Sequence, residues 1–218
     1  MDIVGLGTPF GLAFASGLNA YLPLLAFTIS VRWLHLYKVN PNFAFITSNW
    51  FIAILVILTI LDFVADKIPL IDHAWNAIHT VIRPIAGALV AAASSNSLTG
   101  GIHIPATSSD HGTESVYVAF GAISVTGIVF LIIPLVGGGL AFLSHITKST
   151  TRIVSTITTA GFLNIGFSVL ENVLVVIIVL LSLFASTIMF ILLVLLVLLL
   201  VPRVIQARNT WFKRRRWI

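Results

Sequence analysis

Long apolar stretches, each bounded by charged or turn-forming residues, dominate the pattern along the chain. A helix that crosses a bilayer needs about 20 predominantly apolar residues. Five stretches reach or approach this length and predict membrane-spanning helices: Phe10–Val31, Trp50–Val64, Pro84–Leu98, Val116–Val136 and Val173–Val201. The last is almost entirely Leu, Val and Ile, and it is longer than a hydrocarbon core of about 30 Å requires, so we expect a tilted, lipid-facing helix.

A sixth stretch, Leu140–Thr159, is apolar and hydroxylated but carries His145, Lys148 and Arg152. Such side chains forbid contact with lipid, although they do not forbid burial inside a helix bundle. The pattern therefore leaves five or six spans open. Six is favoured because the segment Thr99–Ser115 contains acids but no Lys or Arg, which suits a loop on the outer face. We expect an all-α membrane helix bundle over residues 1–202.

Composition supports this class, because 58% of the residues are hydrophobic and only 9% are charged. A soluble domain carries about 25% charged residues. The chain has no Cys, which excludes disulfides, thiolate metal sites and cysteine nucleophiles. The five Trp residues lie at or just beyond the predicted span ends, as in an interfacial belt: Trp33, Trp50, Trp75, Trp211 and Trp217.

A basic tail, residues 203–218, follows the last predicted span and contains Arg203, Arg208, Lys213, Arg214, Arg215 and Arg216. Positive charge beside a span indicates the cytoplasmic side and favours contact with anionic lipid headgroups over nucleic acid. No Lys or Arg precedes the first apolar stretch, so we expect a retained span there rather than a signal peptide.

Two features of the first stretch suggest a more elaborate architecture. The segment Gly11–Gly17 matches Gly139–His145 at five of seven positions, which indicates either a weak internal repeat or chance similarity. Further along, Asn19, Tyr21 and Pro23 lie within one predicted span, where Pro23 removes a backbone donor. The sequence permits a broken helix whose polar groups contact a solute, or a kink that neighbouring helices stabilise.

The charged residues in or beside the predicted spans have a net charge of zero. The acids are Asp62, Asp66, Asp72 and Glu171, and the bases are Lys67, Arg83, Lys148 and Arg152. An isolated buried charge costs several kcal/mol, so we expect these groups to meet in one hydrophilic interior.

The spacing of these residues is helical. Asp72, His79 and Arg83 share one face of an amphipathic helix that follows Pro69 and lies at the membrane interface, while Trp75 takes a different face. The other two polar stripes are His145, Lys148 and Arg152, and Asn164 with Glu171. These stripes predict either a pathway for protons, cations or a solute, or an ion-pair lattice that only fixes the register of the helices.

Motifs of soluble enzymes are missing from the sequence. We find no nucleophile elbow, zinc-protease motif, phosphate loop or dinucleotide fingerprint. Asp62 and Asp66 have the spacing with which lipid-headgroup transferases hold a metal, but the rest of that motif is missing. We therefore expect no enzyme activity, no cofactor and no metal site.

Several motifs together resemble domain-of-unknown-function family 4126, a group of small bacterial multipass membrane proteins. They are Ser16–Leu25, Asp62–Pro69 with Asp72 and His73, Arg83–Leu89, His145–Arg152 with Ser155 and Thr156, and Asn164–Glu171. The resemblance covers most of the chain and implies a bacterial inner-membrane protein with no established activity. Two positions depart from the pattern, since the family leads us to expect Glu at Asp62 and Asp at Asn172.

From these observations we expect a small-solute or ion transporter or channel-like protein. Its pathway would contain the following residues: Asn19, Tyr21, Asp62, Asp66, Lys67, Asp72, His79, Arg83, His145, Lys148, Arg152, Asn164 and Glu171. The alternative is a non-catalytic structural or assembly subunit of a membrane complex. The expected partners are the lipid bilayer, anionic headgroups at the tail, and further copies of the chain or another membrane subunit, but no nucleic acid.

Overall fold

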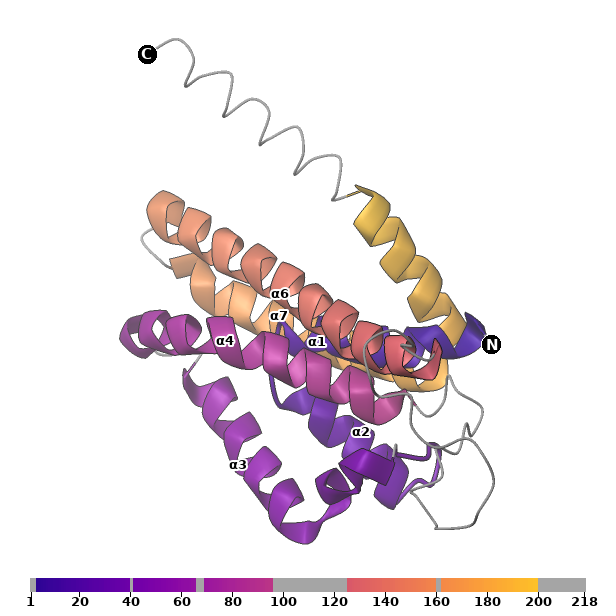
Figure 1. Cartoon of the computed structure of the whole chain (residues 1–218). Helices are drawn as coiled ribbons and strands as arrows, with labels where there is room; N and C mark the ends of the chain where they lie inside the picture. Colours follow the sequence, from indigo (N-terminus) through magenta and orange to yellow (C-terminus); the bar gives the residue numbers. More distant parts are fainter. Residues whose placement is uncertain (1–2, 40, 66–68, 96–124, 160–161, 200–218) are drawn as a thin grey trace, which may run out of the picture.

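The computed structural model describes residues 3–39, 41–65, 69–95, 125–159 and 162–199 (Figure 1). This part of the chain is almost entirely helical and contains no strand, which confirms the predicted all-α class. Two 3₁₀ helices, Ile3–Leu6 and Pro41–Thr47, accompany the α-helices α1 (Gly7–Ser16), α2 (Leu22–Arg32), α3 (Asn49–Ala65), α4 (Pro69–Ser94), α6 (Val125–Thr159) and α7 (Phe162–Phe184). A last described helix spans Ser186–Leu199.

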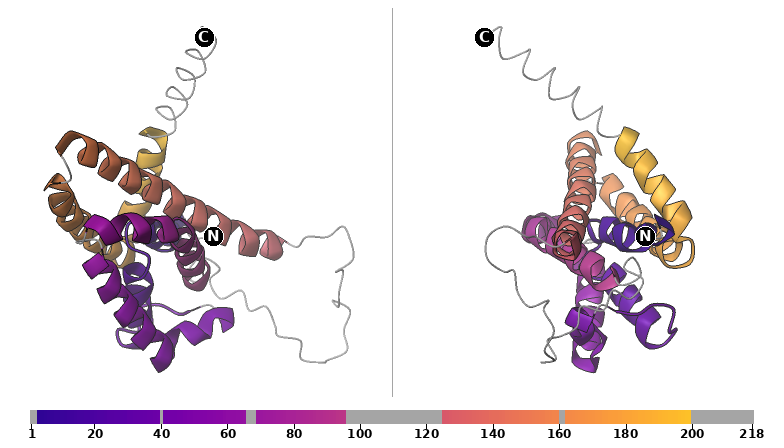
Figure 2. Two further views of the ribbon diagram at one scale, coloured as in Figure 1. Left: turned by 90° about the vertical axis from the view of Figure 1, so that its left-hand side faces the viewer. Right: turned by 45° about the vertical axis from the view of Figure 1, so that its right-hand side comes forward.

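The short helix α1 lies at the centre of the bundle, where it contacts α4, α6 and α7 (Figures 1 and 2). Its sequence of small and apolar residues allows this position, since Leu12, Ala13 and Ala15 are fully buried. The helices α2 and α3 extend to one side of this group. The bundle is therefore built around a helix too short to cross a hydrocarbon core on its own.

Glycines allow α4 and α6 to cross closely. A Cβ atom added at Gly87 would lie 2.4 Å from the Cβ of Ala141, and one added at Gly137 would lie 2.5 Å from the Cβ of Ala91. Small residues at helix crossings are typical of membrane bundles, because van der Waals packing rather than the hydrophobic effect drives helix association in lipid.

Three helical segments are long and apolar enough to cross a membrane by length and composition: Ala77–Ser94, Leu131–Arg152 and Gly166–Phe184. Leu22–Arg32, Asn49–Ala65 and Ser186–Leu199 are shorter apolar helices. The predicted amphipathic helix after Pro69 and the span from Pro84 form one continuous helix, α4, which contains Pro84.

The structure corrects the predicted boundary between Val116–Val136 and Leu140–Thr159. The helix α6 runs unbroken from Val125 to Thr159, so its three glycines at 137–139 continue the helix, and the stretch from Leu140 is not a separate span. The physical reason is the crossing just described: at Gly137 the missing side chain makes room for α4. Residues 116–124 lie outside the described part of the chain.

The expected single helix Val173–Val201 is also wrong. Helical structure begins earlier, at Phe162, and is interrupted at Ala185. The hydroxyl of Thr8 donates to the carbonyl of Ser182 at 2.7 Å, and the hydroxyl of Tyr37 donates to the carbonyl of Leu183. These carbonyls would otherwise accept from the next turn, and side chains that insert into the helical ladder bend helices in this way.

The two similar segments noted in the sequence contact one another. A Cβ atom at Gly17 would approach Ala141 and Ser144, and the Ser144 hydroxyl donates to the carbonyl of Phe14 at 2.7 Å. Their surroundings differ, however, because α1 ends at Ser16 while α6 continues to Thr159.

Candidate functional site

Seven ionisable side chains from four helices lie inside the bundle, each at most 8% exposed. We call them the polar core: Asp62 from α3, His79 and Arg83 from α4, His145, Lys148 and Arg152 from α6, and Glu171 from α7. The predicted convergence of acids and bases is thus observed for the members whose side chains are described.

One half of the polar core surrounds the carboxylate of Asp62. The indole Nε1 of Trp75 donates to Asp62 Oδ1 at 2.9 Å, and His79 Nε2 lies 3.4 Å from the same oxygen. Arg83 Nη2 lies 3.9 Å from it. The other oxygen, Oδ2, is buried and has no hydrogen-bond partner among the described residues. Trp75 was expected on a different face, and this expectation is wrong because Trp75, His79 and Arg83 follow one another at helical spacing of four.

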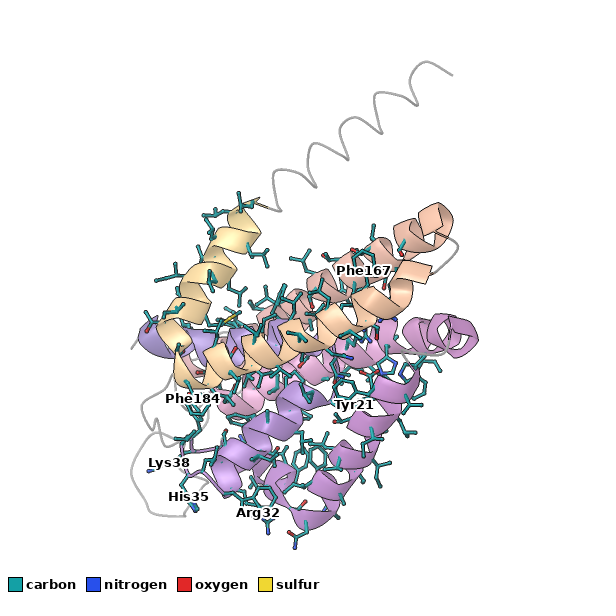
Figure 3. The ribbon with its side chains drawn as sticks, turned by 180° about the vertical axis from the view of Figure 1, so that it is seen from behind. Tyr21, Arg32, His35, Lys38, Phe167 and Phe184 are labelled. Carbon is teal, nitrogen blue, oxygen red and sulfur yellow. The ribbon has the colours of Figure 1, made fainter. Side chains whose placement is uncertain are left out.

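The geometry of His79 brings a ring nitrogen close to the carboxylate of Asp62. Nδ1 of His79 lies 2.8 Å from the carbonyl oxygen of Trp75, which can only accept, so Nδ1 carries a hydrogen. In a neutral ring Nε2 would then present its lone pair to a carboxylate oxygen, which is repulsive. A proton on His79 Nε2 or on Asp62 would make this contact attractive. The ring of Tyr21, labelled in Figure 3, packs edge-on against His79 with centroids 5.7 Å apart.

The geometry of His145 indicates a neutral ring. Arg83 Nη1 lies 2.9 Å from His145 Nδ1, and because guanidinium is only a donor, Nδ1 accepts. The hydrogen is then on Nε2, which donates to Thr80 Oγ1 at 3.1 Å. His145 therefore orients Arg83 without adding charge to the polar core.

Of the two alternatives for the first stretch, the structure shows the broken helix, with the break between α1 and α2. Side chains bind its backbone. Arg83 Nη1 donates to the carbonyl of Gly17 at 3.3 Å, and Lys148 Nζ donates to the carbonyl of Leu18 at 3.0 Å. The side-chain oxygen of Asn19 accepts from the N–H groups of Tyr21 at 3.1 Å and Leu22 at 2.9 Å, which caps the start of α2.

The other half of the polar core is centred on Glu171. Its Oε2 accepts from Arg152 Nη2 at 2.8 Å and lies 3.3 Å from Lys148 Nζ. Since Arg83 and Lys148 bind adjacent carbonyls of the break, the Asp62 half and the Glu171 half are joined through Gly17 and Leu18.

Four predicted pathway residues are not placed. Asp66 and Lys67 lie outside the described residues, while Asp72 and Asn164 belong to α4 and α7 but their side chains are not described. Any role for Asp66 beside Asp62, including the metal-holding spacing, stays a prediction. Sequence reasoning missed two groups of the site: Thr80, which binds His145, and Ser144, which binds the end of α1.

Substitution of Asn19 tests whether its side chain stabilises the start of α2 after the break. Asn19→Ala is expected to lower the free energy of unfolding by about 0.5–2 kcal/mol, because two backbone donors at the start of α2 lose their acceptor. Thermal unfolding of the purified protein in detergent measures this change. Asn49→Ala is the matched control, since Asn49 is exposed at the start of α3. Equal effects of both substitutions would contradict the capping role.

Comparison with known proteins gives one match, to the family model described as Domain of unknown function (DUF4126), over residues 6–206. No curated protein and no solved structure matches the chain.

Proposed function

The chain belongs to the DUF4126 family, and we propose that this member moves a small solute or an ion across the bacterial inner membrane along its polar core. The family match and the apolar segments together establish a member of this family with helices long enough to cross a membrane. The proposal adds a transport role, the cytoplasmic side for the basic tail, and the assignment to the inner membrane.

The observation that carries the proposal is the buried contact between His79 and Asp62, in which Nε2 and Oδ1 lie 3.4 Å apart. Asp62 and His79 are both 0% exposed, and His79 lies in Ala77–Ser94, a segment long and apolar enough to cross a membrane. Ionisable groups in membrane-spanning segments are expensive to bury and mark proton or ion routes in membrane proteins. A carboxylate beside an imidazole is the kind of pair that forms proton relays in membrane proteins.

The arrangement of the polar core gives a second line of support. Its two carboxylates lie on α3 and α7, and Arg83 and Lys148, which each approach one of them, also bind the carbonyls of the broken segment. Broken helices beside charged groups are how many transporters place a site within the bilayer. A shift of α1 relative to α2 would therefore change the partners of both halves together.

The test is proton flux into proteoliposomes that contain a trapped pH-sensitive dye, under an imposed membrane potential, with sodium chloride, potassium chloride or sodium acetate supplied in turn. The wild-type protein is expected to acidify the lumen faster than protein-free vesicles with at least one of these salts. Asp62→Asn should abolish the difference, because an amide accepts from Trp75 but holds no titratable proton.

The matched control is Lys38→Gln, since Lys38 is exposed and lies outside the polar core. Lys38→Gln should conduct like the wild type. A wild-type flux no greater than that of protein-free vesicles with every salt, or an Asp62→Asn flux equal to the wild type, would contradict the proposal.

A structural or assembly role is the second candidate, and one observation favours it: protein side chains already bind two carbonyls of the break, those of Gly17 and Leu18. A scaffold subunit needs hydrogen bonds to these buried carbonyls, but it needs no solute. Purification in mild detergent separates the two, because a stoichiometric partner polypeptide would favour assembly and a uniform homo-oligomer would favour transport.

A further inference from the structure

We propose that Arg32, at the end of α2, binds the phosphate of an anionic phospholipid headgroup. We call the surrounding structure the headgroup site. It consists of the Arg32 guanidinium, the Trp33 indole beside it, and the apolar side chains of Leu34 and Leu36 in the turn that follows. The headgroup site lies outside the polar core, and the inference does not depend on the proposed transport role.

The headgroup site is attached to the end of a segment that can cross a membrane. The hydroxyl of Tyr37 donates to the carbonyl of Leu183, next to Phe184, the last residue of the apolar segment of α7. Between α2 and Tyr37 the chain folds back on the helix, since the N–H of Leu36 donates to the carbonyl of Ser30 at 3.0 Å. This turn therefore lies where the hydrocarbon core gives way to headgroups.

The apolar side chains of the headgroup site are uncovered by protein. Trp33 is 56% exposed, Leu34 is 53% exposed, and Trp50 at the start of α3 is 59% exposed. Indole rings favour the boundary between headgroups and acyl chains, because one edge is polar and the faces are apolar. A lipid surface thus suits these side chains better than water.

The guanidinium of Arg32 is already fixed in position. Nη1 donates to the carbonyl of Thr47, and Cζ lies 5.5 Å from the centroid of the Trp33 ring. Arginine has five N–H donors, and the others of Arg32 have no acceptor among the described residues. In Figure 3 the Arg32 side chain points away from the helices. A fixed planar fork with unused donors matches the oxygens of a phosphate and loses little freedom on binding them.

The charge around Arg32 favours an anionic headgroup over a zwitterionic one. No Asp or Glu occurs between Asp2 and Asp62. The two carboxylates whose positions the structure gives, Asp62 and Glu171, are buried in the polar core. A zwitterionic lipid would bring an ammonium group to a surface without a carboxylate to receive it. A headgroup with a phosphate and no amine avoids this repulsion.

The experiment places a reporter at the headgroup site. Because the chain has no Cys, Leu34→Cys gives the full chain one attachment point for a fluorophore. The labelled protein is reconstituted into phosphatidylcholine vesicles. Small amounts of phosphatidylglycerol or phosphatidylcholine that carry the same nitroxide near the headgroup then quench the fluorophore. The ratio of the two effects gives the preference for the anionic lipid, which we expect to be about fivefold, the effect of one basic side chain.

Three substitutions in this labelled protein test the role of Arg32. Arg32→Gln keeps a donor for the Thr47 carbonyl but removes the charge, so the preference should fall to about one. Trp33→Leu removes the ring beside the guanidinium and should lower the preference by about twofold. Lys38→Gln is the matched control, because it removes the same charge from an exposed residue outside the headgroup site, and it should keep the wild-type preference.

Unfolding midpoints in detergent without added lipid show whether each variant is folded, and Trp33→Leu provides the test if Arg32→Gln is not. Equal quenching by the two labelled lipids while Arg32 is present would overturn the inference. So would an effect of Lys38→Gln as large as that of Arg32→Gln, because general attraction to positive charge would explain both. Loss of the preference when sodium phosphate replaces sodium chloride at constant ionic strength would assign Arg32 to soluble phosphate and overturn the lipid assignment.

Discussion

Replacing Glu171 with Ala is expected to lower the free energy of unfolding by about 3–5 kcal/mol, the cost of leaving a buried ion pair without one partner. The loss is large because Lys148 and Arg152, at most 4% exposed, both use this carboxylate. The measurement is the midpoint of thermal unfolding of the purified protein in detergent, together with the yield of monodisperse protein in size-exclusion chromatography.

The control variant removes one negative and one positive charge of the ion pair. A double variant, Glu171→Leu with Lys148→Met, leaves no excess of positive charge relative to the wild type, so it should be less destabilised than Glu171→Ala, although Leu18 loses a donor to its carbonyl. A double variant destabilised by the sum of its single substitutions would show that Lys148 and Glu171 are not energetically coupled.

Replacing Gly17 with Ala is expected to destabilise the fold by more than about 3 kcal/mol, above the usual cost of overpacking. An added Cβ would lie 1.8 Å from Ser144 Oγ and 2.0 Å from the carbonyl oxygen of Ala141. The serine side chain can rotate, but the carbonyl belongs to the backbone of α6 and cannot move alone. The same displacement would pull the Gly17 carbonyl from Arg83, so both stability and the geometry of the polar core should change.

Gly139→Ala is the matched control for this substitution. Gly139 lies in α6 close to Ala141, but an added Cβ has nothing within 4 Å. Because Ala is a better helix former, stability should stay the same or rise by up to about 1 kcal/mol. If Gly139→Ala destabilised the protein as much as Gly17→Ala, loss of backbone flexibility rather than close packing would explain both results. Unfolding midpoints of the two variants, measured side by side, decide between these explanations.

The sequence by itself determined the class of the protein and the residues that share a helix face. Apolar length and low charge predict membrane-type helices, and the proline in the first stretch predicts an irregularity there, a break or a kink. Helical spacing also places His79 with Arg83, and Lys148 with Arg152, because side chains three and four positions apart lie together whatever the fold.

Tertiary structure alone decided which faces meet and what the special residues do. Three successive glycines have a low helix propensity, yet close packing against α4 keeps α6 continuous there. The carbonyls freed at Gly17 and Leu18 could have contacted a solute, but Arg83 and Lys148 bind them from distant parts of the chain. The physical reason is that helix periodicity is a local property of the backbone, whereas the partners of a buried polar group depend on how separate helices pack.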